Sequence, residues 1–514
     1  MAGNERRLRG GLVGYPAPPQ LRQARCAIIG FGCNQAFLFT MLYLDGSVAG
    51  PEHGFLADRA DLLCLLAVMA ATFALMLHRR CRSALLRAGD GLANLFAAPL
   101  VLALLALVAL RALLPEAPWV GFALMEGLLV GVPLALLLCL WGRALGAVPI
   151  DRSVPEVFIG SALGAAVCFL VVALPVAEAA LLLYALPLGS AWGLRALAAT
   201  ADGGAADGGA GGEGAAAAAS APSASDAPDD DASKLSGRIL AGTVVFGLAT
   251  GAIEAMTARA QAASHTSLSV TFVLFVLYCV AALQLYGGRP LSLGTRAVLP
   301  TESNQETGPL GGAYRLAVLL MVGGFIAVPL LERVGVAGVA VVLAGYLGVF
   351  SVLVSLFLIM GRIAGRDATA SIARGFAALF AGEILGVLAG AGALAAFGGA
   401  GSAPVLVTLA GVAALYAYLF LFTDRDLAAL SVVVSKSDRF GEACARIAAS
   451  AKLSKREAEI LPLALRGRTA ERIAGEFFIS KNTVDTHLRR IYAKCGVHTR
   501  QELIDLGERT EGEL

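Results

Sequence analysis

Charged residues are scarce in this sequence. They account for 15% of its 514 residues, whereas hydrophobic residues account for 57%. An ordinary globular protein contains about 25% charged and about 45 to 50% apolar residues. The shortage is uneven, because 30 of the 78 charged side chains lie in the 92 residues from Thr423 onward. The composition excludes a chain that is water-soluble throughout, and it divides the sequence into a long apolar part and a short charged part.

Patterns for catalysis or metal binding are also missing. The nine cysteines contain no Cys-x-x-Cys pair, so we expect neither a disulfide framework nor a zinc site. The sequence has no Gly-rich phosphate loop, no cluster of metal ligands and no nucleophile accompanied by a base. These absences argue against an enzyme, and we expect no cofactor and no bound metal.

The apolar part consists of long apolar runs. About 20 apolar helical residues cross a bilayer core about 30 Å thick. Twelve stretches reach about this length: 26–45, 60–78, 91–113, 119–141, 154–174, 176–197, 238–258, 267–286, 314–331, 335–360, 372–397 and 403–422. They predict an all-α, polytopic bundle of twelve transmembrane helices in a lipid bilayer. An even number of helices places both ends of the bundle on the same side.

Basic residues between these stretches alternate in number. With the N-terminus inside, the inner segments before Thr423 contain 5, 4, 2, 3, 3 and 3 Lys and Arg residues, and the outer loops contain 1, 1, 0, 1, 1 and 0. Cytoplasmic loops carry the excess of Lys and Arg. We therefore predict that both termini are cytoplasmic. No A-x-A-like cleavage site follows the first helix, so we expect it to be retained.

A segment of low complexity divides the twelve stretches into six plus six. Residues 200–236 are almost entirely Ala, Gly, Ser, Asp and Pro, which is typical of a flexible linker. We expect a cytoplasmic segment at 1–25, transmembrane halves at 26–197 and 238–422, and the linker at 198–237. This division resembles the major facilitator superfamily, whose halves enclose a central cavity. The loop motif of that family after the second helix is missing; its first half (GFLADR, 54–59) follows the first helix instead.

Three carboxylates lie within otherwise apolar stretches: Glu126, Glu254 and Glu383. A charged group at membrane depth costs at least about 2.5 to 3.5 kcal/mol, so such residues usually have a purpose. One interpretation is a polar cavity that binds a small molecule, with a cationic or proton-linked ligand as one possibility. The other is that each carboxyl is protonated or hydrogen-bonded to a neighbouring helix and holds the bundle together.

The charged part from 453 to 514 has the pattern of four short soluble helices. Each helix is preceded by a residue able to cap it: Ser454, Thr469, Ser480 and Thr499. A glutamate three residues after the first and the last of these completes a capping box (SKRE and TRQE). Two helices joined by a tight turn, within a unit of four, predict a helix-turn-helix domain.

The third of these helices has two distinct faces. At about 100° per residue, one stripe is apolar and is expected to face the core: Val484, Leu488, Ile491 and Cys495. The opposite side carries Asn482, Thr486, Arg489 and Ala493, flanked by Lys481, Asp485 and Arg490. Polar side chains interleaved with small ones, together with a net charge of +3 from Lys481 to Cys495, are typical of a helix that enters the DNA major groove.

The segment from Leu453 to Leu506 resembles the LuxR-type helix-turn-helix family. The resemblance covers about a tenth of the chain and lies in Arg456-Glu457, Leu461, Gly467, Ile473-Ala474, Ile479-Ser480, Thr483-Val484, His487, Ile491, Lys494, Gly496-Val497 and Arg500. It implies base contacts from Asp485, Thr486 and Arg489, and contacts to the DNA backbone from Lys481, Thr483, Arg490 and Lys494. At Asp485 the family more often has Lys. Asp485 could accept from a cytosine amino group or hold Arg489 by an i,i+4 pair.

A connector at 423–452 joins the last transmembrane stretch to this domain. It has apolar residues at helical spacing: Phe440, Ala443, Cys444 and Ile447. This pattern indicates an amphipathic helix that transmits or restrains motion, or a simple tether on the inner leaflet.

These features together predict a membrane-embedded one-component transcription regulator in a bacterial inner membrane. The membrane domain would sense a small molecule or membrane state, and the cytoplasmic domain would bind promoter DNA. Two-fold operators would require two chains, so we expect a homodimer on double-stranded DNA. The alternative is a major-facilitator-like transporter with a regulatory DNA-binding tail.

Overall fold

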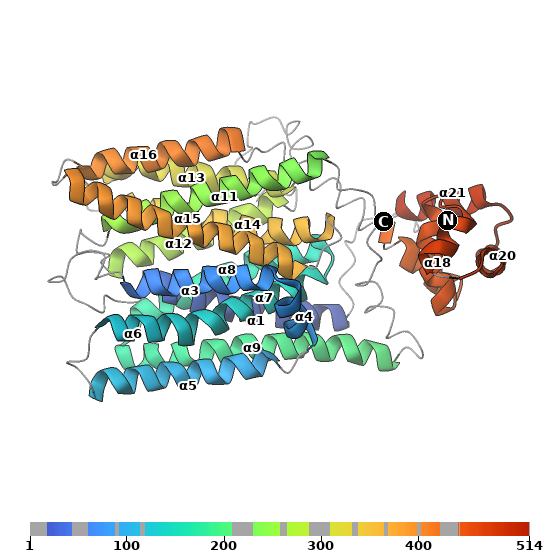
Figure 1. The fold of residues 1–514 in the computed structure, drawn as a ribbon, viewed down its shortest axis with the longest axis horizontal. Coiled ribbons are helices and arrows are strands. Elements are labelled where there is room, and N and C mark those ends of the chain that lie inside the picture. The colour runs from blue at the N-terminus through green and yellow to red at the C-terminus, as the bar shows by residue number, and fades with distance from the viewer. Residues whose placement is uncertain are drawn as a thin grey trace, which may run out of the picture.

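The computed structural model describes residues 18–43, 60–87, 92–113, 119–207, 230–257, 265–286, 309–331, 338–363, 368–397, 402–421, 440–441, 443–477 and 479–512. Within these ranges the chain is almost entirely helical and contains no strand (Figure 1). Two separate hydrophobic cores are present. The larger core is built by helices before residue 422 and the smaller one by residues from 440 onward. The expected division into an apolar bundle and a small helical domain is confirmed.

The first half of the bundle contains α1 (Pro18–Tyr43), α3 (Ala60–Leu77), α4 (Arg79–Arg87), α5 (Leu92–Leu113), α6 (Trp119–Glu126), the π-helical turn η3 (Gly127–Gly131), α7 (Val132–Gly146), α8 (Ile150–Ala173) and α9 (Val176–Asp207). The second half contains α11 (Asp230–Thr257), α12 (His265–Tyr286), α13 (Pro309–Leu331), α14 (Gly338–Ile363), α15 (Ala368–Phe397), α16 (Ser402–Tyr416) and the π-helical turn η7 (Ala417–Leu421). In Figure 1, α5 and α9 lie along one side of the bundle, and α13 and α16 lie along the other.

Every expected transmembrane stretch coincides with helical structure. Of the described helices, eight are long and apolar enough to cross a membrane, and the bent pair Asp61–Leu77 with Arg79–Leu85 makes a ninth. Three shorter apolar segments occupy the positions of the third, seventh and twelfth expected helices: Ala97–Leu107, Gly237–Ala252 and Thr408–Leu419. The chain is therefore an all-α membrane protein with the predicted order of helices.

Three local features differ from the expected helix pattern. The chain bends by 96° between α3 and α4, and Arg82 Nη1 donates to the carbonyls of Met76 and Leu77 at the end of α3. The turn η3 interrupts the fourth stretch just before Pro133, which lacks the N–H that a regular helix requires. Helices α9 and α11 also extend into the expected linker, to Asp207 and from Asp230; residues 208–229 lie outside the described part of the chain.

The most extensive pairing of helices joins α11 to α15 in the second half. Glycines spaced by four line both sides of this contact: Gly247 and Gly251 on α11, and Gly382 and Gly386 on α15. A Cβ added at any of them would collide with a backbone carbonyl oxygen of the opposite helix. Small residues at such positions allow two transmembrane helices to approach closely.

The two halves meet through α8 against α12 and through α3 against α15. Their interface is aromatic: Phe39 of α1 contacts Phe275 and Phe350, and Phe73 of α3 stacks on Phe376 with ring centroids 5.6 Å apart. At one end of the bundle, Arg362 Nη2 of α14 donates to the Val148 carbonyl, between α7 and α8, at 2.7 Å. These contacts join the halves across the core and at that end.

The C-terminal domain contains α18 (Lys455–Leu465), α19 (Ala470–Phe477), α20 (Lys481–Cys495) and α21 (Arg500–Gly512) (Figure 1). The four predicted N-cap residues each accept a hydrogen bond from the backbone N–H three residues later: Ser454, Thr469, Ser480 and Thr499. The second expected capping box closes differently, because Glu502 accepts from the backbone N–H of His498 rather than from that of Thr499. Gly467 and Gly496 end α18 and α20 with positive φ values of 74° and 68°.

Candidate nucleic-acid interface and membrane polar cluster

Helix α18 begins with a complete capping box, and the glutamate of this box also pairs with a lysine of α20. Glu457 Oε2 accepts from the Ser454 backbone N–H at 2.7 Å and from Lys494 Nζ at 2.6 Å. Only 2% of the Glu457 side chain is exposed. Burial alone would raise the pKa of Glu457, but hydrogen bonds from Lys494 and Ser454 outweigh it and lower the pKa from its ordinary 4.5 to about 2. An ion pair between the buried Glu457 and the exposed Lys494 thus joins the start of α18 to the end of α20.

Helices α19 and α20 form the helix-turn-helix pair. Ser480 caps α20 by accepting from the Thr483 backbone N–H at 3.2 Å. Lys481, in the first turn of α20, forms an ion pair with Glu471 of α19. The hydrogen bond from Lys481 lowers the pKa of Glu471 and raises the pKa of Lys481. Both side chains are exposed, so this pair orients α20 on α19 but adds little stability.

The two faces of α20 are as predicted. Val484, Leu488 and Ile491 are buried in the small core, and Cys495 is half-buried beside them. The exposed side presents most of the predicted DNA contacts: Lys481, Asn482, Thr483, Thr486, Arg489, Arg490 and Lys494. Asp485 is half-buried. The structure therefore gathers these side chains on one surface, as major-groove binding requires.

Some of these side chains already have partners within the domain. The Thr483 hydroxyl lies 2.8 Å from the Ser480 hydroxyl, and the Thr486 hydroxyl donates to the Asn482 carbonyl at 2.8 Å. Lys494 donates to Glu457 and also to the Lys452 carbonyl, at 3.3 Å. A phosphate contact by Lys494 would compete with its ion pair to Glu457, whereas Arg489 and Arg490 extend from the exposed surface.

Part of the expected connector belongs to the C-terminal domain. Residues 443–450 are helical, and Ala443, Cys444 and Ile447 are buried, the latter two within the same core as α18 and α20. Phe440 lies under the Arg466 guanidinium, 4.9 Å from ring centroid to Cζ. The apolar side of this helix, which lies within the expected connector, thus covers the domain core; residues 422–439 lie outside the description.

In the membrane bundle, two of the three predicted glutamates lie together. Glu254 of α11 and Glu383 of α15 lie within electrostatic range of each other and of Tyr43 of α1. Tyr346 of α14 faces Tyr43, with ring centroids 6.4 Å apart at 82°. The Tyr346 hydroxyl also lies within interaction range of Thr250 and Glu383. We call these five side chains the Tyr–Glu cluster.

Glu126 is placed elsewhere. It is 7% exposed at the end of α6, directly before η3. The main contacts of α6 are with α3, α5 and η3, none of which contributes to the Tyr–Glu cluster. The three glutamates therefore do not form a single site.

The sequence did not single out Tyr43, Thr250 or Tyr346. The only signal was the presence of polar side chains within apolar stretches, which they share with Asn34 and Gln35. Both of these residues are buried on α1, and the amide nitrogen and oxygen of each have no hydrogen-bond partner. Several polar groups within the bundle are therefore held without a partner from the protein.

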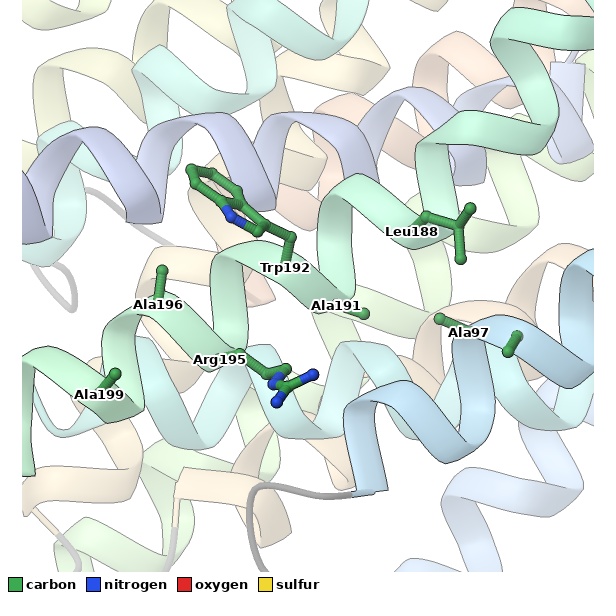
Figure 2. A pocket seen from close by; sticks show the side chains of 8 residues that line it. Ala97, Leu188, Ala191, Trp192, Arg195, Ala196 and Ala199 are labelled. Carbon is green, nitrogen blue, oxygen red and sulfur yellow. The ribbon is translucent and has the colours of Figure 1, made fainter.

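A separate groove lies between α5 and α9 (Figure 2). Its volume is about 570 Å³, and its lining is mostly alanine, with Leu188, Trp192 and Arg195. Figure 2 shows Trp192 and Arg195 projecting from α9 in different directions, and both are exposed. None of the three predicted glutamates lines this groove.

Comparisons with known proteins bear on the two regions separately. Residues 451–506 match the family of bacterial regulatory proteins, luxR family. Over 53 residues the chain is 43% identical to the oxygen regulatory protein NreC of Staphylococcus aureus strains JH9 and JH1. The matched part is 10% of this chain and 24% of those proteins, so the chain spans about a quarter of the length of these relatives.

The bundle has general likenesses among solved structures. A bacterial homologue of the iron transporter ferroportin in an outward-facing state matches 81% of this chain and 99% of its own, with a TM-score of 0.47 and 12% identity. The human organic anion transporter MFSD10 (TETRAN) matches 79% and 100%, with a TM-score of 0.44 and 14% identity. These identities do not transfer the cargo of either protein to this chain.

The C-terminal region is thus a LuxR-type helix-turn-helix domain, the kind of domain with which bacterial transcription regulators bind DNA. The chain as a whole joins this domain to a polytopic helical membrane domain.

Proposed function

We propose that this protein is a membrane-embedded one-component transcription regulator. The observation that carries the proposal is the exposed face of α20, formed in a LuxR-type domain on the same chain as the membrane bundle. Only 18 residues, 422–439, separate the last described bundle residue from the first described residue of that domain. A change in the bundle would therefore act on a DNA-binding domain held close to the membrane.

The proposed DNA contacts follow from the positions on α20. Asp485, Thr486 and Arg489 contact base edges in the major groove, with Asn482 beside them. Lys481, Thr483 and Arg490 contact the phosphates. Lys494 contacts a phosphate only when its ion pair with Glu457 is broken. Contacts to bases specify the sequence, whereas contacts to phosphates position the domain.

The remaining parts of the proposal concern placement and assembly. The distribution of Lys and Arg supports a bacterial inner-membrane location with both termini in the cytoplasm, where the chromosome lies. Two-fold operators are bound by two helix-turn-helix domains whose recognition helices enter successive major grooves. We therefore include a homodimer on DNA, and a small-molecule signal received by the bundle.

DNA footprinting with the fragment 436–514 tests the DNA-binding part. Specific binding weakens by roughly tenfold to a hundredfold in Arg489→Ala, because a bidentate contact to a base contributes about 1 to 3 kcal/mol. Arg446→Ala is the matched control, since Arg446 is an exposed arginine on the 443–450 helix and not on α20. Absence of sequence-selective protection, or equal protection by both variants, contradicts the proposal. Raising the salt concentration lowers the affinity steeply, because binding releases counterions.

A transporter with a regulatory DNA-binding tail is the second candidate. Buried carboxylates within the bundle favour it, because ionisable side chains inside a membrane domain often lie on a substrate or proton path. Solute uptake into vesicles that is lost in Glu126→Gln or Glu383→Gln supports transport. Ligand binding without flux supports a sensor.

A further inference from the structure

The Tyr–Glu cluster has contributions from both halves of the bundle. Tyr43 is the last residue of α1 in the first half, whereas Thr250, Glu254, Tyr346 and Glu383 come from α11, α14 and α15 in the second half. Thr250 and Glu254 lie four residues apart and therefore on one face of α11. A ligand held by this cluster would contact both halves.

Glycine packing brings the carboxylates together. Gly247 and Gly251 of α11 lie against the backbone of α15 at Leu379 and Glu383. Because no side chain separates the helices there, Glu254, one turn after Gly251, lies within electrostatic range of Glu383. Two carboxylates at such range in an apolar bundle repel each other when both are charged, and a positive charge between them relieves the repulsion.

Three oxygen atoms of the cluster are buried without a hydrogen-bond partner. Tyr346 is 0% and Glu383 is 1% exposed. The Tyr346 hydroxyl and Glu383 Oε2 have no hydrogen-bond partner, and neither does the buried Tyr43 hydroxyl. Leaving a buried polar group unsatisfied costs about 1 to 3 kcal/mol, and more for a charged group. Three unpartnered oxygens on side chains that neighbour one another therefore indicate a group that all of them can contact.

The chemistry of these oxygens selects a cation. Carboxylate and hydroxyl oxygens are ligands of hard cations and acceptors for ammonium N–H groups. The aromatic rings of Tyr43 and Tyr346 add an attraction for positive charge. Within the described part of the chain, no three His, Cys, Asp or Glu side chains gather to hold a metal ion. When two close carboxyls share one proton they carry a single negative charge, which suits one positive charge better than a divalent metal.

We propose that Tyr43, Tyr346, Glu254 and Glu383 bind a compact monovalent cation, either an alkali-metal ion or the ammonium group of a small amine, between the two halves of the bundle. The claim that this cation is the signal for the regulator rests on the proposed function. The claim that the cluster binds the cation rests only on the geometry of the cluster. Binding favours the arrangement in which α1 lies against α14 and α15.

Thermal unfolding of the full-length protein in detergent tests the site. Melting is recorded at constant pH and ionic strength in sodium, potassium, methylammonium or tetraethylammonium chloride. A cation that binds only the folded protein raises the Tm as its concentration exceeds the dissociation constant. A rise of a few degrees with sodium or potassium identifies an alkali-metal ion, and a rise with methylammonium identifies an amine. Equal melting in all four salts overturns the proposal.

Variants separate the cluster from general salt effects. Glu383→Gln and Tyr346→Phe each lower the apparent affinity for the cation, read from the concentration at which the Tm rises, by tenfold or more. Tyr346→Phe removes only one hydroxyl, so it still tests the site should Glu383→Gln fail to fold. The controls are Glu156→Gln, a buried carboxyl of α8, and Tyr278→Phe, whose hydroxyl donates to the Ala313 carbonyl at 3.0 Å. A rise that both cluster variants retain overturns the site. If lowering the pH raises the Tm equally without any specific cation, the bound species is a proton, and the proposed cation site is also overturned.

A second measurement distinguishes the site from its role in signalling. The affinity of the full-length protein for its footprinted DNA is compared with and without the stabilising cation, in the wild type and in Tyr346→Phe. A change of DNA affinity in the wild type alone supports cation sensing. A cation that stabilises the protein while DNA affinity stays equal confirms the site and contradicts the signalling role.

Discussion

The LuxR-type domain and the membrane bundle differ in how many of their buried polar groups have hydrogen-bond partners. In the described part of the domain, caps, a capping box and the Glu457–Lys494 ion pair satisfy nearly all of them, and His487 Nδ1 is the one unpartnered buried side-chain atom recorded. In the bundle, unpartnered atoms occur on Asn34, Gln35, Tyr43, Tyr346 and Glu383. The DNA-binding domain is thus built to hold one shape, whereas the bundle retains polar groups that a ligand or water can satisfy.

This contrast has a physical origin. In a small water-soluble domain, the unsatisfied backbone groups at the helix ends need capping partners. The small core adds little stability, so these caps matter more. In a lipid bilayer, helices satisfy their own backbones and associate through close packing, so that side-chain hydrogen bonds are less necessary for stability. Polar side chains can therefore remain in the bundle without a partner from the protein, as Asn34 and Gln35 do.

The largest expected effect breaks the packing that stabilises the bundle. Gly251→Leu places a side chain where a Cβ already collides with the Glu383 carbonyl, and it lowers stability by about 3 kcal/mol or more, at the upper end of overpacking effects. Monodispersity and melting in detergent measure the loss. Gly392→Leu on α15 is the control, because nothing lies within 4 Å of its Cβ position and the residue is exposed. Equal losses in both variants would refute close packing of α11 on α15.

The second largest effect is expected from removing the charge of Glu457, which holds hydrogen bonds to Ser454 and Lys494 in the DNA-binding domain. The pKa of Glu457 lies below its ordinary value, so Glu457 stabilises the domain above about pH 4.5, and this contribution is lost as the pH falls toward about 2. Glu457→Gln lowers stability at pH 7 by roughly 2 to 3 kcal/mol and flattens this pH dependence. Denaturant unfolding of the fragment 436–514 from pH 2 to pH 7 measures both quantities. Glu459→Gln serves as the control, and an unchanged pH slope in Glu457→Gln contradicts the expectation.

A smaller effect concerns the contact between the two halves of the bundle. Arg362 donates from Nε to the Gly146 carbonyl at 3.3 Å and from Nη2 to the Val148 carbonyl at 2.7 Å. Arg362→Ala removes about 1 to 1.5 kcal/mol, as expected for such hydrogen bonds, so amides around 146–153 exchange roughly tenfold faster. Hydrogen exchange with mass spectrometry detects this change. Exposed Arg374 on α15 supplies the control variant, Arg374→Ala; similar exchange in both variants would show that Arg362 does not join the halves.

The smallest effect sharpens the contrast by improving a helix end of the DNA-binding domain. Lys452 has a φ of 48° where the 443–450 helix ends, and the Leu453 backbone N–H donates to the Ala448 carbonyl at 2.9 Å. Glycine adopts this conformation without steric cost, so Lys452→Gly raises stability by about 0.5 to 1 kcal/mol. The melting temperature of the fragment 436–514 reports the gain. Ala451→Gly, at a position without positive φ, lowers it; a loss in Lys452→Gly as well would exclude relief of strain.

Local patterns were sufficient to predict most of the DNA-binding domain. Caps such as Ser454 and Ser480 act over three residues, so the sequence around them contains the whole interaction. The amphipathic pattern of α20 likewise predicted that Val484 and Ile491 face the core. Only the fold shows that Cys444 and Ile447 of the connector complete the same core.

The sequence by itself determined the helices, their order and the exposed face of α20, because hydrophobicity and capping depend on residues close together in the chain. Only the tertiary structure decided that Glu383 lies with Glu254, Tyr43 and Tyr346 and that Glu126 does not. Apolar stretches in a bilayer are nearly alike in hydropathy, so their pairing depends on side-chain shape, as at Gly247 and Gly251, and not on hydrophobicity. Shape complementarity between distant segments leaves no pattern that a single sequence displays.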